Sequence, residues 1–287
     1  MNISQLRLNY HARIAQNLLF VSGDEALGGI PNLANQQNKL SVALAWGIVN
    51  RIVQTPVHGD IPWQVATSRF EAVTCDFLQA SSAYLNHLRP GDFQYECRNT
   101  AISRFVQYDH LLEIEEALED NKALKAAFGG NYIVAPDIVI SRMPIADDEI
   151  NISGILTDET GEHAKHTPLR ASNQTVPRPF LHAVISCKWT LRNDRAQNTK
   201  IEAANLIHNR KGNLPHIVAV TAEPLPSRIA ALALGTGDLD CVYHFALNEL
   251  MAAVLDSPYI DAADLLQMMV DGKRLRDISD LPFDLAA

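Results

Sequence analysis

Two kinds of spacing alternate along the chain and predict an α/β protein. Short apolar runs rich in β-branched residues predict buried strands over 132–141, 181–189, 215–221 and 240–245. Segments of helical character predict helices between and after these strands, over 195–209, 227–234 and 247–255. Because strands alternate with helices, we expect a central mixed β-sheet flanked by helices.

The first part of the chain is predicted to be mainly helical, over 1–20, 41–53 and 106–128. A further helix follows from an apolar stripe made by Phe70, Val73, Phe77, Ala80 and Tyr84. The stripe places Glu71 near the protein's interior, where a glutamate needs a partner.

The chain is long enough to bury a sizeable core. Its 287 residues, 47% of them hydrophobic and 20% charged, are typical of one globular domain. We expect an N-terminal helical portion over about residues 1–128 and a core over about residues 130–287. The polar segment 146–180 is predicted to cover the surface as hairpin and loop.

Several protein classes are disfavoured by composition. No apolar run approaches the roughly 18 residues of a membrane span, and the first ten residues are too polar for a signal peptide, so we expect a cytoplasmic protein. The four cysteines are far apart and form no Cys-x-x-Cys pair, which indicates neither a disulfide framework nor a zinc site.

Charge is distributed unevenly. The net charge of −9 argues against a protein that coats nucleic acid by overall attraction. Between Lys188 and Lys211, however, the sequence contains six cationic residues and only two acidic ones. The six are Lys188, Arg192, Arg195, Lys200, Arg210 and Lys211. This cluster is either a solvated helix face or a local surface for an anionic ligand.

A lysine ends the strand predicted over 181–189. Alternation along the strand places Val184, Ser186 and Lys188 on one face. The lysine therefore emerges just before the positive N-terminal end of a helix, which suits an anionic ligand.

Asp137, Ser186-x-Lys188 and Glu202 form a pattern with a mechanistic logic. Hydrolysis of a phosphodiester requires neutralised phosphate charge and hydroxide near neutral pH, and magnesium held by carboxylates supplies both. Nucleases usually carry an acid two residues before the lysine, where this chain has Ser186. Glu202, on the following helix, is a possible substitute. The alternative is an aspartate in a turn and a lysine at a sheet edge.

The next motif, Arg192-x-Asp194-Arg195, suits base recognition in the DNA major groove. Guanine offers O6 and N7 to an arginine fork, and cytosine offers an amino group to a carboxylate. The alternative interpretation is a helix N-cap with surface ion pairs.

At these motifs the chain resembles the CCGG group of PD-(D/E)xK type II restriction endonucleases, and within it enzymes that cut GCCGGC. The resemblance is near-continuous from about Tyr132 to the C-terminus and patchier before Phe70. The matching motifs are Ser186 to Thr190, Arg192-x-Asp194-Arg195-Ala196-Gln197-Asn198, Asn209 to Gly212, Leu214 to Val218, Thr221 to Pro224, Pro226 to Ile229, Ala233 to Gly237, Asp240 to Leu247, Lys273 to Leu275 and Asp277 to Leu281.

The resemblance implies a catalytic set. Asp137, Glu202 and the backbone carbonyl of Cys187 would hold Mg²⁺, with two ions per active site. Lys188 would position the phosphate and the attacking water, and Glu202 would be the displaced acid of the motif. Glu71 matches a further active-site glutamate. Ser186 belongs to the set as the residue at the position of the missing acid.

The resemblance also implies a DNA-reading set. Arg192, Asp194 and Arg195 match residues that read the inner CCGG. Gln64 and Arg228 match contacts to the outer base pair. Asn35 stands where the family has an aspartate, so the resemblance leaves the outer base pair open.

Function and partners follow from the resemblance. We expect a prokaryotic, Mg²⁺-dependent endonuclease of a restriction-modification system. It would cut double-stranded DNA at a CCGG-core palindrome, taken to be GCCGGC, to give 5′-phosphate ends with 5′ overhangs. A palindrome requires at least a homodimer, and the resemblance implies a homotetramer. The alternatives are a repair or resolving nuclease of the same superfamily that reads DNA shape, and a DNA-binding protein that does not cut.

Overall fold

Two compact units make up the protein. The computed structural model describes residues 2–23, 28–97, 100–119, 134–158, 160–235 and 237–287. The first unit comprises Met1–Arg89, Ile185–Ala204 and His216–Ala287, and the second comprises Pro90–Val184 and Asn205–Pro215. One strand and one long helix contribute residues to both units.

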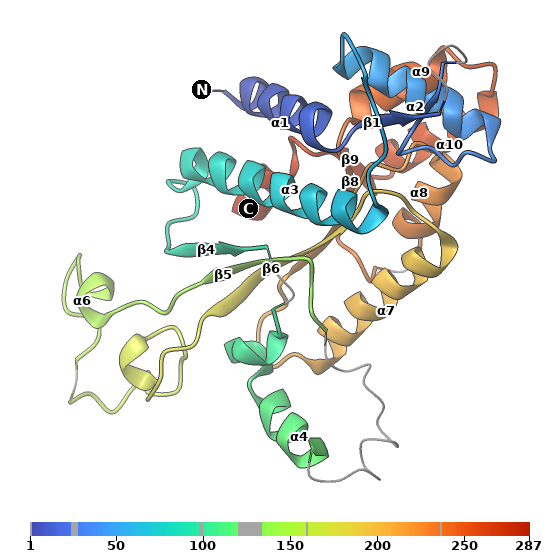
Figure 1. The fold of residues 1–287 in the computed structure, drawn as a ribbon. Coiled ribbons are helices and arrows are strands. Elements are labelled where there is room, and N and C mark those ends of the chain that lie inside the picture. Colours follow the sequence, from blue (N-terminus) through green and yellow to red (C-terminus); the bar gives the residue numbers. More distant parts are fainter. Residues whose placement is uncertain (1, 24–27, 98–99, 120–133, 159, 236) are drawn as a thin grey trace. The chain divides into compact units, whose positions relative to one another are not determined.

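A six-stranded mixed sheet runs through the fold (Figure 1). Its strands, in spatial order, are β4 (Phe93–Glu96), β5 (Ile138–Arg142), β6 (Phe180–Lys188), β7 (His216–Thr221), β8 (Cys241–His244) and β9 (Leu275–Asp277). In the second unit β4 pairs antiparallel with β5. In the first unit β8 pairs in parallel with both β7 and β9. The predicted mixed α/β class, with helices flanking a central sheet, is confirmed.

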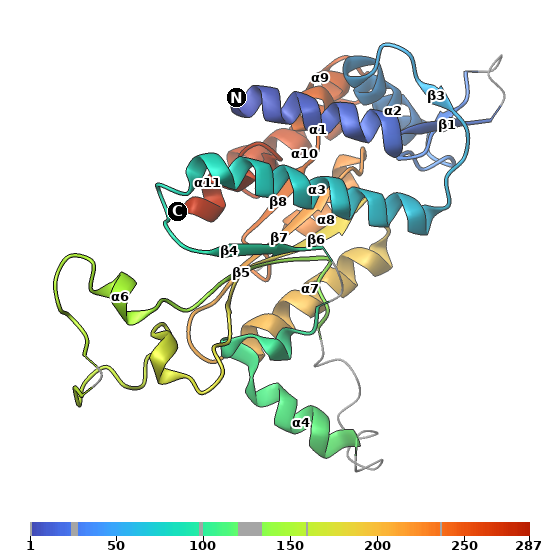
Figure 2. The ribbon, with the colours of Figure 1, turned by 60° about the vertical axis from the view of Figure 1, so that its left-hand side comes forward.

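Helices of the first unit pack in pairs. They are α1 (Ile3–Asn17), α2 (Lys39–Ile52), α3 (Trp63–Leu85), α8 (Pro226–Ala233), α9 (Leu247–Leu255), α10 (Ile260–Asp271) and α11 (Leu281–Ala286), together with the first part of α7 (Asn193–Asn209). Figure 2 shows α1 lying beside α3, and α2 packs against α9. A small sheet, β2 (Ile30–Pro31), β1 (Phe20–Ser22) and β3 (Val57–His58), precedes α3.

Strand β6 is buried on both faces. Ala183, Ile185 and Cys187 are inaccessible to solvent, and Val184 nearly so, which is why this segment reads as a continuous apolar run rather than an alternating one. The strand ends at Lys188, which is half-buried. A buried apolar strand therefore ends in one charged residue, Lys188, which is only partly buried.

Trp189, the residue after β6, packs against two aromatic rings. Its ring lies 5.3 Å from the ring of Phe70 on α3 and 6.0 Å from the ring of Phe245, centroid to centroid. Such aromatic pairs stabilise by about 0.5–1.5 kcal/mol beyond the area they bury. Helix α3 and the end of β6 are thus held together directly beside Lys188.

The predicted stripe on α3 is correct at its start and wrong at its end. Phe70, Val73 and Phe77 are buried, whereas Ala80 and Tyr84 are exposed. The buried positions continue instead at Leu78 and Ser81, which follow the 3.6-residue period. The predicted stripe repeats every 3.5 residues, and such a repeat drifts around a straight helix. Glu71, beside the stripe, is half-buried as expected.

An ion cluster ties α1 to the C-terminal half of the first unit. The Arg7 guanidinium donates to both carboxylate oxygens of Glu249 (2.8 and 2.6 Å) and of Asp277 (2.8 and 2.8 Å). Burial raises the pKa of each carboxyl, but hydrogen bonds and charge attraction from Arg7 outweigh burial and leave both pKa values below their ordinary range. The charged form of the cluster is therefore favoured.

The second unit contains α4 (His110–Glu119) and the 3₁₀ helices η2 (Ile102–Arg104) and η3 (Val106–Tyr108). The helix predicted over 106–128 thus begins as a 3₁₀ turn. Its residues from 120 on, and the predicted strand residues 132 and 133, lie outside the described residues. Strand β5 begins at Ile138, so Pro136 and Asp137 precede it and Pro136 removes no donor from the ladder.

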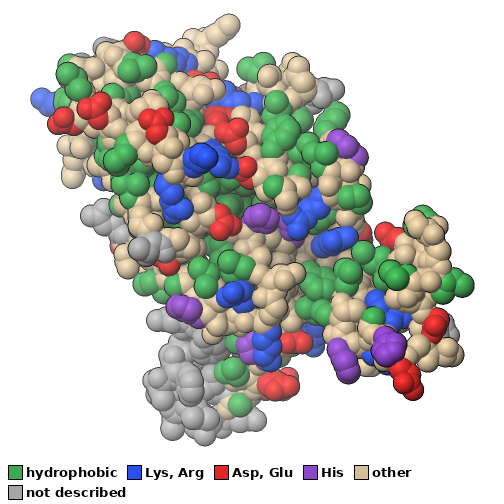
Figure 3. Space-filling model, turned by 180° about the vertical axis from the view of Figure 1, so that it is seen from behind, with side chains coloured by type: hydrophobic (Ala, Val, Ile, Leu, Met, Phe, Trp, Pro, Cys, Tyr) green, Lys and Arg blue, Asp and Glu red, His purple; other side chains and the backbone are tan. Residues whose placement is uncertain are grey.

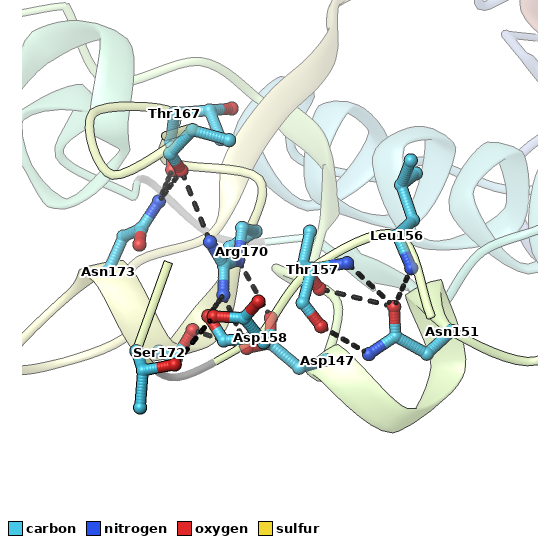
Figure 4. A network of polar contacts seen from close by, with 11 residues as sticks. Asp147, Asn151, Leu156, Thr157, Asp158, Thr167, Arg170, Ser172 and Asn173 are labelled. Carbon is cyan, nitrogen blue, oxygen red and sulfur yellow. Dashed lines mark hydrogen bonds and ion pairs between the residues drawn. The ribbon is translucent and has the colours of Figure 1, made fainter. Parts of the chain in front are cut away.

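Residues 145–176 form a braced lobe in the second unit, and Figure 4 shows its polar network. The buried Arg170 side chain donates two hydrogen bonds to Asp147 (2.9 and 2.6 Å), and Asn151 accepts from the backbone N–H groups of Leu156 and Thr157. In place of the predicted hairpin, the segment has the short helices α6 (Asp147–Ile150) and η4 (Ala171–Asn173) and a parallel bridge from residue 145 to 170. None of the helices in the described parts of the chain is both long and apolar enough to cross a membrane.

Candidate nucleic-acid interface and active site

The segment between β6 and α7 is held at both ends. The carbonyl oxygen of Lys188 accepts hydrogen bonds from Thr221 Oγ1 (2.9 Å) and from the backbone N–H of Ala222 (3.2 Å). Leu191 is fully buried, and its N–H donates to Glu223 Oε2 at 2.8 Å. The backbone path from Lys188 to the start of α7 is therefore fixed by the end of β7.

The three predicted base-reading residues lie at the start of α7. Helix α7 begins at Asn193, two residues before the predicted start at Arg195. The N–H of Ala196 donates the first helical hydrogen bond to the Arg192 carbonyl (3.0 Å). Arg192 and Asp194 are exposed, and Arg195 is half-buried. All three lie within a single turn, directly after the buried Leu191.

Arg195 lies over an exposed tryptophan at the start of α3. Its guanidinium carbon is 4.6 Å from the centroid of the Trp63 ring, a cation–π contact within the usual range of about 6 Å. Trp63 is 58% exposed. Gln64, the next residue of α3 and a predicted DNA contact, is also exposed. The Trp63 ring thus restricts the Arg195 side chain, while both side chains remain partly exposed to solvent.

A polar pocket of about 570 Å³ brings three of the predicted DNA contacts together. Asn35, Arg192 and Arg228 all line it. Its other lining residues are Asn32, Ala34, Gln36, Gln37, Trp63 and Thr190. Among the described residues that line it none is acidic, so the pocket offers two guanidinium groups and several amides. These are the side chains that hydrogen-bond base edges and phosphates.

The loop that forms one wall of this pocket, residues 32–37, is fixed by hydrogen bonds to residues on either side of it. Asn32 Nδ2 donates to the carbonyl of Leu18 (2.7 Å), and Leu33 is fully buried. The N–H of Asn35 donates to Ser41 Oγ at 2.8 Å. Asn35 is half-buried, and its side-chain oxygen accepts from the N–H of Gln37 at 3.3 Å, so its position on the pocket wall is fixed.

Basic side chains elsewhere are mixed with acidic ones. On the face in Figure 3, Lys and Arg side chains lie among acidic and hydrophobic ones. This distribution agrees with the net charge of −9.

Glu223, which lies in the motif Thr221 to Pro224, is directly linked to the segment between β6 and α7 and to Arg228. Its side chain is completely buried and lies 3.5 Å from Arg228, and its backbone carbonyl lies 3.2 Å from Nε2 of His244 on β8. Burial raises the pKa of its carboxyl, while the N–H groups of Leu191 and Leu225 and the charge of Arg228 oppose that rise. The signal in the sequence was a glutamate in the run from Ile217 to Pro226, whose other residues are apolar except Thr221.

The predicted catalytic residues are divided between the units. Glu71 (half-buried, on α3), Ser186 and Cys187 (buried, on β6) and Glu202 (exposed, on α7) belong with Lys188 to the first unit. Asp137 is half-buried in the bend before β5, in the second unit.

The predicted metal ligands are two carboxylates, of Asp137 and Glu202, and the backbone carbonyl of Cys187. All are oxygen donors, the ligand chemistry that Mg²⁺ prefers. Within the described ranges no group of three or more His, Cys, Asp or Glu side chains is placed to hold a metal ion. The predicted set differs from such a cluster because one of its donors is a backbone oxygen.

Comparison with known proteins identifies the family. The model of the NgoMIV restriction enzyme family matches residues 10–287. The chain is 46% identical over 287 residues to the type II restriction enzyme NgoMIV of Neisseria gonorrhoeae, covering 99% of this chain and 98% of the relative. A solved structure of the restriction endonuclease BsaWI in a pre-specific complex with DNA aligns only distantly, with a TM-score of 0.28 and 13% identity over 100% of this chain and 93% of the other. The first two matches span nearly the whole chain, so this protein is a member of the NgoMIV restriction enzyme family and a type II restriction endonuclease.

Proposed function

We propose that this nuclease cuts double-stranded DNA at a palindrome with a CCGG core, GCCGGC, in a Mg²⁺-dependent reaction. The products carry 5′-phosphate ends with 5′ overhangs. The enzyme is the cutting partner of a restriction-modification system and acts in the bacterial cytoplasm, where the DNA is. The observation that carries this proposal is the polar pocket, where Asn35, Arg192 and Arg228 converge from a loop and two helix starts.

The inner CCGG is read by the first turn of α7. Arg192 and Arg195 each offer a guanidinium fork to guanine O6 and N7, and Asp194 accepts from a cytosine amino group. Each bidentate contact gives about 1–3 kcal/mol of discrimination against a wrong base. Arg195 is already restricted by the Trp63 ring, so less rotamer freedom is lost when it binds a base.

The outer base pair is read by Gln64, Arg228 and Asn35. Asn35 and Arg228 line the same pocket, and Gln64 adjoins Trp63 of its wall. An asparagine has both donor and acceptor atoms, whereas an ionised aspartate only accepts. Asn35→Asp should therefore change the preference at the outer pair and leave the CCGG core preference intact.

Catalysis is assigned to Asp137, Lys188, Glu202, Glu71 and Ser186. Asp137, Glu202 and the Cys187 carbonyl would hold Mg²⁺, with two ions per active site, and the bound metal would neutralise phosphate charge and supply hydroxide near neutral pH. The Lys188 ammonium contacts the phosphate and orients the attacking water, and the hydrogen bonds on the Lys188 carbonyl hold the backbone from which this side chain extends.

The remaining members of the set are a serine and a second glutamate. Ser186 is neutral where related nucleases carry an acid, so its hydroxyl can hydrogen-bond but adds no charge. Glu71 adds a carboxylate from α3, the helix that packs on Trp189 through Phe70. The two acids Glu71 and Glu202 thus come from helices rather than from β6.

A palindromic site is matched by a two-fold dimer with one active site for each strand. Two such dimers form a homotetramer that holds two DNA duplexes. The braced lobe, residues 145–176, suits this second contact because it exposes large apolar side chains on a backbone held by its own hydrogen bonds. The exposed side chains are Ile152, Ile155, Leu156 and Val176.

Light scattering and cleavage rates test the assembly. The wild type should have the mass of a tetramer and cut a two-site plasmid faster than a one-site plasmid, because the connecting DNA holds the second site at high local concentration. Leu156→Glu should yield dimers with equal rates on both plasmids. Leu88→Glu, at an exposed leucine of the first unit, is the control. A wild type of dimeric mass with equal rates would refute the tetramer and leave the nuclease assignment standing.

The reading assignment is tested by alanine at Arg192, Asp194 and Arg195. Each variant should lose far more affinity for CCGG-containing duplexes than for random DNA. A repair nuclease that reads shape would show equal losses on both, as expected for phosphate contacts. A protein that binds without cutting would leave the DNA intact in the presence of Mg²⁺.

A further inference from the structure

Residues at and just after the end of β7 hydrogen-bond to Lys188, at the end of β6, and to Leu191, which precedes Arg192. Thr221 Oγ1 and the N–H of Ala222 donate to the Lys188 carbonyl at 2.9 and 3.2 Å. The next residue, Glu223, accepts from the N–H of Leu191 at 2.8 Å. Three consecutive residues therefore hold the segment 188–191 at its two ends.

Both oxygens of Glu223 are occupied. Oε1 accepts from the N–H of Leu225 at 3.2 Å, and Oε2 accepts from Leu191 and lies 3.5 Å from Arg228 Nη1. The backbone of Glu223 is anchored as well, because its N–H donates to Thr221 Oγ1 (3.1 Å). Every contact thus restricts where the carboxylate can be.

A buried carboxylate is a costly way to fill this space. The Glu223 side chain is 0% exposed, and an apolar side chain of similar size would avoid the desolvation of a charge. A carboxylate, unlike an apolar side chain, makes directional contacts here. It accepts a hydrogen bond from the N–H of Leu191, the residue before Arg192, and attracts the guanidinium of Arg228. Those two arginines line the same pocket.

We propose that Glu223 is a positioning residue for sequence reading, which holds Arg192 and Arg228 at the relative placement that matches the base edges of the site. The inference rests on the proposed function, because it takes these arginines as base contacts. Thr221, the last residue of β7, extends the same link to Lys188, so the three residues from Thr221 to Glu223 join the reading residues to the catalytic lysine.

Glu223→Gln tests the proposal with little change in volume. The new amide nitrogen donates where the carboxylate accepted, so one of the two backbone N–H groups loses its acceptor. The wild-type cleavage site is mapped first, and dissociation constants are measured for that duplex, for duplexes with one base pair changed, and for random DNA. The variant should lose roughly tenfold or more of its preference for the mapped site, with affinity for random DNA unchanged.

Two further variants separate positioning from general damage. Ser227→Ala, at an exposed neighbour on α8, should behave as the wild type. In the double variant Glu223→Gln/Arg192→Ala, the loss of preference should be smaller than the sum of the two single losses, because part of the glutamate's effect acts through Arg192 and only the part that acts through Arg228 remains. Additive losses would overturn the proposal, as would an unchanged preference in a folded Glu223→Gln protein or an equal loss on all three kinds of DNA.

Thr221 provides a second test, of its link to Lys188. Thr221→Val removes the hydroxyl bond to the Lys188 carbonyl together with the acceptor of the Glu223 N–H, and should slow cleavage at saturating DNA by several fold more than it weakens binding. Thr221→Ser keeps the hydroxyl and should restore the rate. If valine and serine give the same rate, the link between β7 and the lysine is refuted. A wild type without any sequence preference would instead refute the proposed function.

Discussion

Trp63→Ala should weaken binding to the cognate site by about two- to fivefold and leave binding to random DNA unchanged. The Arg195 guanidinium lies 4.6 Å from the Trp63 ring centroid. A cation–π contact at an exposed site contributes about 0.5–1 kcal/mol, which corresponds to that change in affinity. Because Trp63 is 58% exposed, its removal should cost little stability.

The assay is competition binding between the cognate duplex and random DNA at several salt concentrations, without Mg²⁺ so that no cleavage occurs. Trp63→Phe keeps an aromatic face and should recover most of the affinity. Tyr84→Ala, at an exposed aromatic residue near the far end of α3, is the matched control and should change nothing. The salt dependence should stay constant, since no phosphate contact is lost.

Three outcomes would refute this reasoning. Equal losses on cognate and random DNA would place Arg195 on a phosphate. A reduced salt dependence would indicate the same. Unchanged or tighter cognate binding would mean that the ring holds Arg195 away from its base.

Further predictions concern the chemistry and the stability. Lys188→Ala should abolish cleavage and keep specific binding, because Lys188 serves the reaction more than the affinity, and Asp137→Ala should abolish cleavage in a protein that still folds; near-normal cleavage by either variant rules out this active site. Glu202→Ala should inactivate the enzyme, and adding Ser186→Glu should restore part of the rate; a fully active Glu202→Ala protein refutes the displaced acid. Arg7→Ala should lose about 3–5 kcal/mol of unfolding free energy at pH 7 in urea titrations, because two carboxylates lose their partner. Both carboxyls have lowered pKa values when folded, so this loss should be full above the ordinary carboxyl pKa and shrink as pH falls through the folded values; a loss that grows in acid would contradict the sign.

Much of the regular structure could be predicted from spacing alone. Strand β6 and helix α9 lie where the apolar patterns place them, because burial on fixed faces is what those patterns encode. Tyr84 on α3 was predicted to be buried and is exposed, because a 3.5-residue repeat drifts around the helix. The region from α10 to α11 was not predicted.

The site was less accessible to prediction. The wall that carries Asn35 and the turn that carries Arg192 are far apart in sequence, and only folding brings them to one pocket. Resemblance could assign roles to both residues but could not show that they meet. Glu223 was missed as a site residue because its importance lies in hydrogen bonds to backbone groups, which side-chain motifs do not reveal.

Digestion of a plasmid of known sequence with Mg²⁺, followed by mapping of every new end, tests the central claim most directly. We predict breaks only within palindromes that contain CCGG, with 5′-phosphates and 5′ overhangs at GCCGGC, and none when Mg²⁺ is chelated. Ends at sites that lack CCGG, or ends scattered without regard to sequence, would contradict the account.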